Sequence, residues 1–288
     1  MAIFIDFSPI IISAVNMGDK QFGQDLTPEI IRHLALTMIL NLKKQFSHKY
    51  GKVIICIDSG NVWRKDYFPH YKFSRRKSRD ESPLDWDMIY KSIESITQEM
   101  KDYLPYHVID VPRCEADDII GVLVEYFNHN ELVESLLDTE PQHSIIISRD
   151  KDFKQLHRAN VVQWDPSKKV WLRENSPSDF LIEQIIRGDS ADGVPNMLSQ
   201  DDSFVMKVRQ KAVRQTLVED VLKNGVPKEN LEFYNRNKQL VDLSMIPEKY
   251  REQIITTYKE YKPQPKSKLL TYVVDKQLKN LHEHIQYF

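Results

Sequence analysis

The chain is poor in cysteine and has no long apolar run. Its 288 residues include two cysteines, Cys56 and Cys114, which lie far apart and form no CxxC pair, so the sequence indicates neither a zinc site nor a disulfide framework. No apolar run approaches the roughly eighteen residues that span a bilayer, and residues 1–15 carry Asp6 and no leading basic segment. We therefore expect a cytoplasmic protein without a membrane segment.

Internal repeats, low-complexity tracts and nucleophile motifs are also missing. The nine histidines are scattered and none accompanies a serine or cysteine motif, so covalent catalysis has no support. With 41% hydrophobic and 28% charged residues, the composition is that of a globular protein with enough apolar material for one large domain or two modest ones.

Strand-like and helix-like patterns alternate over the first two thirds of the chain. The pattern predicts strands at 2–6, 53–58, 106–110 and 144–148. It predicts helices at 27–46, at 85–103 and from 115 to about 127 or beyond. This order is typical of an α/β fold with a central, mainly parallel (mixed) sheet flanked by helices on both faces.

The last part of the chain has a different pattern. A hairpin of 161–164 and 170–172 is expected at the edge of the sheet, and strand signals then disappear beyond about residue 177. Helical periodicity continues at 178–187, 203–223, 228–243 and 247–261. We therefore expect an α/β catalytic domain at 1–176 and a helical C-terminal domain at 177–288.

Charge is unevenly distributed along the chain. The net charge of −2 is not that of a typical nucleic-acid-binding protein, which carries an excess of lysine and arginine. Residues 61–82, the basic segment, are an exception, since they hold seven basic residues within 63–79: Arg64, Lys65, Lys72, Arg75, Arg76, Lys77 and Arg79. So many positive charges form a local field that attracts phosphate.

Nine acidic residues lie at or near the predicted carboxyl ends of strands or in the loop after residue 187. They are Asp6, Asp58, Glu115, Asp117, Asp118, Asp150, Asp152, Asp189 and Asp192. Each alone is explained as a helix cap, a first-turn acid or a turn former. Because the ends of parallel strands meet at one edge of a sheet, however, we expect these carboxylates to converge and to repel one another unless cations neutralise them.

Oxygen ligands without histidine or cysteine suit Mg²⁺ or Mn²⁺. The pair Asp150 and Asp152 in SRDKDF could address two ions. Two such ions about 4 Å apart serve in-line attack on a phosphodiester, one activating water and the other stabilising the leaving oxygen. Without the nine acids the net charge of −2 becomes +7, which leaves a chain basic enough to hold a polyanion.

Six motifs carry a resemblance to a known family: IDFS, CID followed by WRKD, EADD, SRDKDF, GDSADGV and LLTYVV. In this order they make the chain resemble the flap endonuclease family of structure-specific 5′ nucleases, and within it the ribonucleases H of T-even bacteriophages. The resemblance implies a Mg²⁺-dependent 5′ to 3′ exonuclease and flap endonuclease that acts on RNA–DNA hybrids and on flapped or nicked DNA. It also implies a role in removing RNA primers during phage lagging-strand synthesis.

The resemblance also assigns residues. By motif position, the first of two metal ions would be surrounded by Asp6, Asp58, Glu115, Asp117 and Asp150. Asp152, Asp189 and Asp192 would serve the second ion, and Asp118 would support the ligands. The basic segment corresponds to the family's helical arch, in which Lys72 and either Arg75 or Arg76 would contact the scissile phosphate.

The remaining residues of the basic segment are expected to bind nucleic acid. These are Arg64, Lys65, Tyr71, Lys77 and Arg79. Its aromatic residues, interleaved with the cations, could stack on single-stranded bases: Trp63, Tyr67, Phe68, Tyr71 and Phe73. Because its like charges repel one another, this segment could be disordered in the unbound protein.

One motif departs from the family pattern. The sequence GDSADGVPNMLSQDDSF lacks the Gly-rich turn that grips duplex DNA in relatives, so a monovalent-cation site is not predicted there. Duplex contact is expected instead from Lys207, Arg209, Lys211 and Arg214. We expect a monomer, and the sequence leaves open whether a single-strand-binding protein or sliding clamp recruits it.

Two alternatives from other classes stay open. A PIN-type ribonuclease also places four acids at the edge of a parallel sheet, but such chains are shorter and lack a long basic segment. An inert nucleic-acid-binding scaffold would have lost some of the carboxylates, whereas all nine are present in this chain.

Overall fold

The computed structural model describes residues 1–134 and 143–288, without the side chains of 24, 76–78, 129–134 and 279–280. Its centre is a six-stranded sheet of order β3-β2-β1-β4-β5-β6. The first five strands pair in parallel and β6 pairs antiparallel with β5, so the predicted mixed, mainly parallel sheet with an edge hairpin is confirmed. The strands are β1 Ala2–Asp6, β2 Lys52–Ile57, β3 His107–Asp110, β4 Ser144–Ile147, β5 Val161–Asp165 and β6 Val170–Leu172.

Twelve α-helices lie in the described residues. Those that precede β6 in the chain are α1 Phe7–Phe22, α2 Pro28–Tyr50, α3 Arg64–Tyr67, α4 Phe73–Asp80, α5 Trp86–Tyr103 and α6 Ala116–Glu134. The later ones are α7 Pro177–Arg187, α8 Gln215–Asn224, α9 Leu231–Val241, α10 Glu248–Glu260, α11 Lys266–Asp275 and α12 Lys279–His282. Short 3₁₀ helices are η1 Gly23–Asp25, η2 Lys151–Leu156, η3 Lys228–Asn230, η4 Leu243–Met245 and η5 Ile285–Tyr287.

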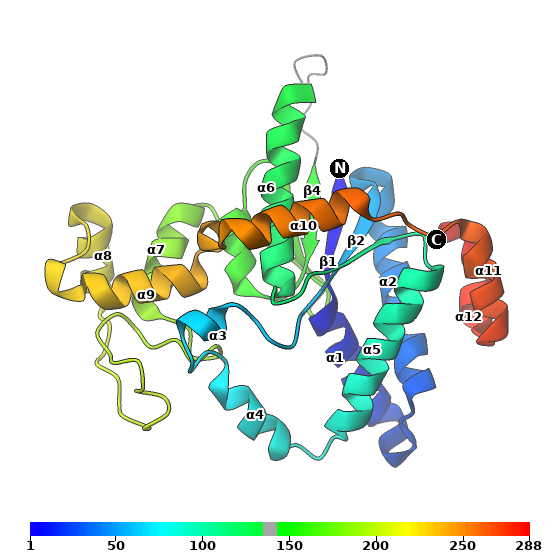
Figure 1. The fold of residues 1–288 in the computed structure, drawn as a ribbon, viewed down its shortest axis with the longest axis horizontal. Coiled ribbons are helices and arrows are strands. Elements are labelled where there is room, and N and C mark those ends of the chain that lie inside the picture. Colours follow the sequence, from blue (N-terminus) through cyan, green and yellow to red (C-terminus); the bar gives the residue numbers. More distant parts are fainter. Residues whose placement is uncertain (135–142) are drawn as a thin grey trace.

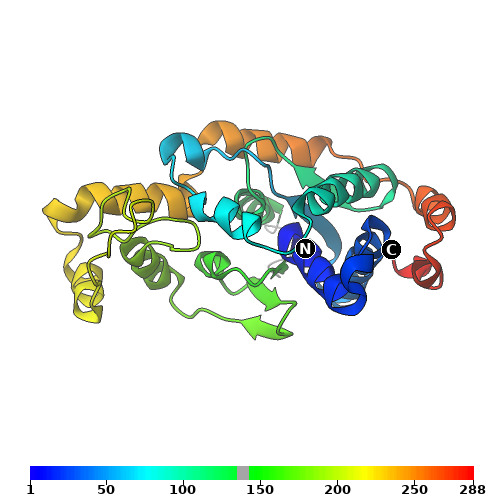
Figure 2. The same cartoon turned by 90° about the horizontal axis from the view of Figure 1, so that it is seen from below.

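Helices cover both faces of the sheet, because alternate residues of each strand point to opposite sides. Ile3 and Ile5 of β1 pack in one core with α1, α2, α5 and α11. Phe4, between them, packs in a second core with α6 and α10. Figure 1 shows α10 crossing α6. Figure 2, which views the molecule from below, shows that α11 and α12 lie at the opposite end of the molecule from α8 and α9.

Local signals explain the helices that were predicted well. The side chain of Thr27 accepts a hydrogen bond from the N–H of Ile30 at the start of α2, and Pro28 occupies the first helical position. Asp85 caps α5 in the same way by accepting from the N–H of Met88 at 2.9 Å. The sequence analysis left open that the basic segment is disordered in the unbound protein. In the structure this segment contains the helices α3 and α4.

Two segments differ from the prediction. Residues 7–22, for which no element was predicted, form α1; Pro9 is tolerated because it lies in the first turn, where its missing N–H is not needed. The helix predicted over 203–223 forms only as α8. Residues ahead of it are held in a loop by Asn196, whose side chain donates to the carbonyl of Lys211 at 2.8 Å.

None of the helices in the described ranges 1–134 and 143–288 is long and apolar enough to cross a membrane.

Candidate active site

Five carboxylates from four places in the chain line one cavity at the carboxyl edge of the sheet. Asp6 ends β1, Asp58 follows β2, and Asp150 lies three residues beyond β4. Glu115 and Asp117 come from the start of α6. All five line a cavity of about 550 Å³, so the structure brings together in one cavity five of the nine carboxylates that were expected to converge.

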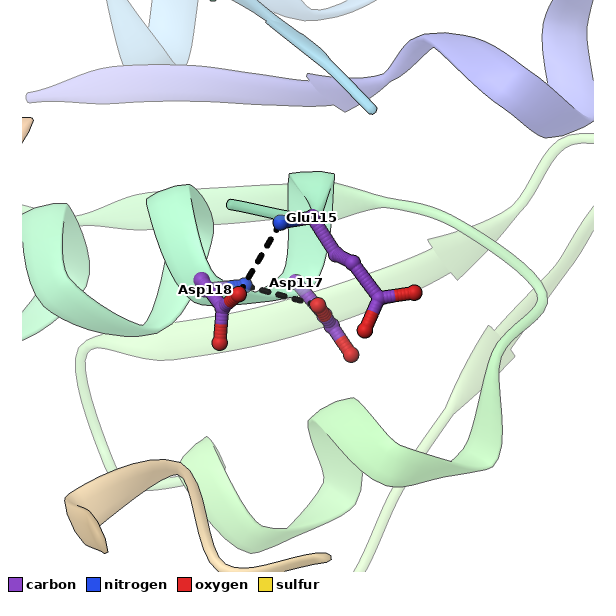
Figure 3. Close-up of side chains that lie close together, drawn as sticks. All are labelled: Glu115, Asp117 and Asp118. Atoms are coloured by element: carbon purple, nitrogen blue, oxygen red, sulfur yellow. Dashed lines mark hydrogen bonds between the residues drawn. The ribbon is translucent and has the colours of Figure 1, made fainter. Parts of the chain in front are cut away.

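The start of α6 holds the tightest acidic cluster (Figure 3). Carboxylate oxygens of Glu115, Asp117 and Asp118 lie within 4.8 Å of one another. The N–H of Glu115 donates to Asp118 at 2.9 Å, and the N–H of Asp118 donates to Asp117 at 2.8 Å. These bonds use backbone donors of the first turn, where the helix dipole also favours negative charge.

Arg64 lies beneath this cluster with 1% of its surface exposed. Its guanidinium is 2.9 Å from Glu115 and 2.8 Å from Asp118, and its Nε donates to the carbonyl of Leu240 in α9 at 2.9 Å. The indole N–H of Trp63 donates to the other oxygen of Asp118 at 3.0 Å. One oxygen of Asp118 therefore accepts two hydrogen bonds and the other is paired with Arg64, which leaves Asp118 a supporting position beside Glu115 and Asp117.

This burial corrects part of the sequence analysis. Arg64 and Tyr71 were expected to contact nucleic acid, but both are buried; the Tyr71 hydroxyl lies 3.0 Å from Glu115 and 2.9 Å from Asp192. Trp63 and Phe68 are buried as well. Of the five aromatic residues expected to stack on bases, only Tyr67 and Phe73 are exposed. The sequence of the basic segment is amphipathic and basic, which favoured exposed side chains, but most of its large aromatic side chains pack into the protein interior.

Lys72 and Arg75 point their charges at the carboxylates. Lys72 contacts Glu115 directly and lies 3.4 Å from Asp192, and Arg75 lies 2.7 Å from Asp192. Burial lowers the pKa of Lys72, but the carboxylates outweigh it and hold that pKa above its usual value. For the carboxyl groups of Glu115 and Asp192 burial acts in the opposite direction and raises the pKa. The neighbouring cations outweigh burial, however, and keep both pKa values below their usual range.

The loop after α7 fixes the position of Lys72. The N–H of Lys72, a residue with a φ of 55°, donates to the carbonyl of Asp192 at 2.7 Å. Gly193 follows with a φ of 72°, and a Cβ there would come within 3.0 Å of the His70 carbonyl. Glycine is needed at this position because it combines left-handed backbone with a close approach of the basic segment.

Asp152, Asp189 and Asp192 lie beside the cavity. Gln184 of α7 donates to Asp152, and Lys151 lies 3.0 Å from Asp189. Burial raises the pKa of Asp152 well above its usual value, and the charges of Asp150 and Asp189 add to the effect. Asp150 also accepts from the N–H of Asp152 at 3.0 Å, so it caps η2 as well as facing the cavity.

The remaining carboxylates favour a cation in the cavity. Burial, followed by the charge of Asp58, raises the pKa of Asp6 well above its usual value. Burial likewise raises the pKa values of Asp117 and Asp150. A bound divalent cation would relieve this repulsion, and the all-oxygen donor set fits a hard cation such as Mg²⁺.

Other candidate residues lie farther out. Lys65 and Arg79 are exposed on the basic segment, and so are Lys207, Arg209, Lys211 and Arg214 in the loop before α8. The side chains of Arg76 and Lys77 lie outside the described residues. The sequence analysis missed Arg149 and Lys151, which line the cavity and flank Asp150 in SRDKDF; their alternation with acids was the signal that could have found them.

Two family models together match residues 23–288. Residues 23–181 match the N-terminal resolvase-like domain of 5′-3′ exonucleases, and residues 176–288 match the C-terminal part of the phage T4 ribonuclease H. The chain is 34% identical to ribonuclease H of Enterobacteria phage T4 over 99% of this chain and 94% of that one. It is 25% identical to the flap endonuclease Xni of Pseudoalteromonas translucida, over 68% of this chain and 75% of that one.

Solved structures show the same fold at low sequence identity. A bacteriophage T5 flap endonuclease in complex with DNA and metal ions matches with a TM-score of 0.60 at 16% identity, over 99% of each chain. The T5 5′-exonuclease with bound zinc matches with a TM-score of 0.58 at 14% identity, over 96% of this chain and 98% of that one. The carboxylate cavity therefore lies in a 5′-nuclease fold, and the chain belongs to the 5′-3′ exonuclease and flap endonuclease family, with the C-terminal part of the T4 ribonuclease H type.

Proposed function

We propose that the chain is a Mg²⁺-dependent 5′ nuclease that hydrolyses phosphodiester bonds in RNA–DNA hybrids and in flapped or nicked duplex DNA. The observation that carries the proposal is the single cavity lined by five carboxylates together with Lys72 and Arg75. Carboxylates alone would repel the phosphate of a substrate, whereas carboxylates with divalent cations and two basic side chains attract it.

Two Mg²⁺ ions, or Mn²⁺ in their place, are proposed as cofactors. Asp6, Asp58, Glu115, Asp117 and Asp150 would hold the first ion, and Asp152, Asp189 and Asp192 would serve the second. When bound, such ions supply an activated water and stabilise the leaving oxygen. Asp118 and Arg64 act through their neighbours, because their contacts fix where Glu115 and Asp117 lie.

The basic residues of the chain bind and orient the substrate. Lys72 and Arg75 would meet the scissile phosphate and neutralise the charge that develops on its oxygens. Lys207, Arg209, Lys211 and Arg214 would contact the duplex backbone from the exposed loop before α8. We further propose that the chain acts as a monomer in the host cytoplasm, where it would remove RNA primers in phage DNA replication and be recruited by a single-strand-binding protein or sliding clamp.

The proposal predicts metal-dependent release of short 5′ products. The test uses a 5′-labelled RNA–DNA hybrid and a 5′-flap duplex, incubated in Mg²⁺ or in chelator. Asp150→Asn should lower the cleavage rate by about 100-fold or more, since loss of even a residue that only supports a metal ligand costs 10- to 100-fold. Asp275→Asn, an exposed acid on α11, is the matched control and should cleave normally. Tight binding without cleavage in any divalent metal would overturn the proposal.

Stability should depend on metal and pH together. Burial raises the folded-state pKa values of Asp6, Asp117 and Asp152, so the metal-free folded protein binds more protons than the unfolded chain and loses stability as the pH rises above about 4. The lowered pKa values of Glu115 and Asp192 add no pH dependence above about 5. The rise in melting temperature caused by Mg²⁺ should therefore be larger at pH about 8 than at about 5.5. Differential scanning fluorimetry checks this, and an equal rise at both pH values would contradict it.

A further inference from the structure

The carboxylate cavity contains four cations, of which three are paired within the protein. They are Lys72, Arg75, Arg149 and Lys151. Lys72 and Arg75 pair with Asp192, as described above, and Lys151 lies 3.0 Å from Asp189. Arg149 is exposed, and its guanidinium has no ion pair or hydrogen bond with any other residue that the structure describes. A ligand can therefore bind Arg149 without displacing a carboxylate.

Arg149 belongs to the segment that joins β4 to η2, and η2 packs against α7. Gln184 of α7 donates a hydrogen bond to Asp152 of η2. The exposed cations that are proposed to contact duplex DNA lie in the loop between α7 and α8. The segment that carries Arg149 therefore leads from the carboxylates toward the part of the chain that is proposed to hold the duplex.

The chemistry of Arg149 suits a phosphate. A guanidinium presents a planar fork of donors that binds two phosphate oxygens at once, and it keeps its charge at any working pH. Lys72 and Arg75 come from the basic segment and are proposed to meet the scissile phosphate. Arg149 comes from a different part of the chain, so a strand that crosses the cavity would present a second phosphate to it.

We propose that Arg149 binds the first phosphate on the 3′ side of the cleaved bond, in the part of the strand that stays in the duplex. The inference rests on the proposed function and adds a substrate-binding residue to it. The charge of that phosphate does not change during hydrolysis, so Arg149 stabilises the bound substrate and the transition state equally. Loss of Arg149 should therefore raise KM and leave kcat unchanged.

The test is a thermodynamic cycle that removes one charge from the protein and one from the nucleic acid. Two 5′-flap duplexes each carry one uncharged methylphosphonate, in place of the first phosphate on the 3′ side or on the 5′ side of the cleaved bond. Binding is measured with Ca²⁺ in place of Mg²⁺ to prevent cleavage. Arg149→Met should bind the unmodified duplex about ten-fold more weakly, which is the loss of one charge-assisted contact. The 3′-side methylphosphonate should weaken binding by the parent protein to the same extent and leave the affinity of Arg149→Met unchanged.

Two further variants serve as controls. Arg149→Lys keeps the charge and should keep the salt dependence of binding, whereas Arg149→Met should lower the slope of log affinity against log salt by about one. Arg173→Met is the matched control, because Arg173 directly follows β6, is exposed and lies outside the carboxylate cavity. Its loss removes the same charge and should change neither the affinity nor the effect of the methylphosphonate.

Steady-state cleavage in Mg²⁺ separates Arg149 from the residues at the scissile phosphate. Arg149→Met should raise KM about ten-fold at unchanged kcat. A fall in kcat at unchanged KM would place Arg149 at the scissile phosphate and overturn the assignment. The assignment would also fail if Arg149→Met stayed as sensitive as the parent to the 3′-side methylphosphonate, or if it lost sensitivity to the 5′-side one instead.

The same measurements separate this phosphate site from the proposed function. Cleavage in Mg²⁺ by a protein in which the two charges show no coupling would remove the phosphate site alone. Coupling in Ca²⁺ in a protein that cleaves nothing in any divalent metal would keep the phosphate site and remove the nuclease.

Discussion

Replacing Arg64 with methionine is expected to lower the free energy of unfolding by about 3–5 kcal/mol, the usual cost of removing one partner from a buried ion pair. Arg64 is 1% exposed, and Asp118 beside it is completely buried. Methionine fills a similar volume but carries no charge, so the Asp118 carboxylate would keep only the Trp63 indole and the Glu115 N–H as partners. The variant would also release Glu115 and the Leu240 carbonyl.

Urea unfolding in chelator measures this loss without any contribution from bound metal. Lys101→Met is the matched control, because the Lys101–Asp110 pair is 3.1 Å long but partly exposed, and such pairs contribute less than about 1 kcal/mol. Adding Asp118→Asn to Arg64→Met should recover part of the loss, since the second change removes the unpaired charge. A loss under about 1 kcal/mol for Arg64→Met would show that the buried pair does not stabilise the fold.

The burial of Arg64 could not be predicted from the sequence, whereas the positions of several carboxylates could. Strand-terminal Asp6, Asp58 and Asp150 could be placed because the ends of parallel strands meet at one edge whatever the details of packing. The partners of Arg64 lie 51 residues away at Glu115 and 176 residues away at Leu240, and no local pattern links them. Arginine is rarely buried, so composition favoured an exposed phosphate contact, and tertiary pairing with three carboxylates overrides that preference.

The loop after Asp192 shows the same limit for backbone structure. Helical periodicity in the sequence extends across 203–214, but these residues form no helix, because the residues before them, 195–201, are bound to α9. Buried Arg236 donates to the carbonyl of Pro195 at 2.9 Å and pairs with Asp201 at 2.6 Å, and Asn237 donates to the same carbonyl. These contacts span about 40 residues of sequence, and they hold the loop in a form that a helix period cannot predict.

Replacing Lys72 with methionine should have opposite effects on cleavage and on metal binding. Lys72 lies against Glu115 and near Asp192, and these carboxylates outweigh the effect of its burial and hold its pKa above the usual value. In the metal-free protein its charge therefore acts as an internal counterion. If the carboxylates held a metal ion, as proposed above, the Lys72 ammonium would be free to contact the substrate phosphate. We expect the variant to cleave about 10²- to 10³-fold more slowly, as when one charge-stabilising donor is lost.

Divalent affinity should rise in the same variant, because the metal no longer competes with a cation already in contact with Glu115. Isothermal titration with Mn²⁺ in the absence of nucleic acid should show about ten-fold tighter binding, equal to about 1.4 kcal/mol. Lys65→Met removes the same charge from an exposed position on the same segment, so it corrects for the change in net charge. If Lys72→Met bound Mn²⁺ no more tightly than Lys65→Met, Lys72 would not compete with the metal for Glu115, and Arg64 alone would be the counterion of that carboxylate.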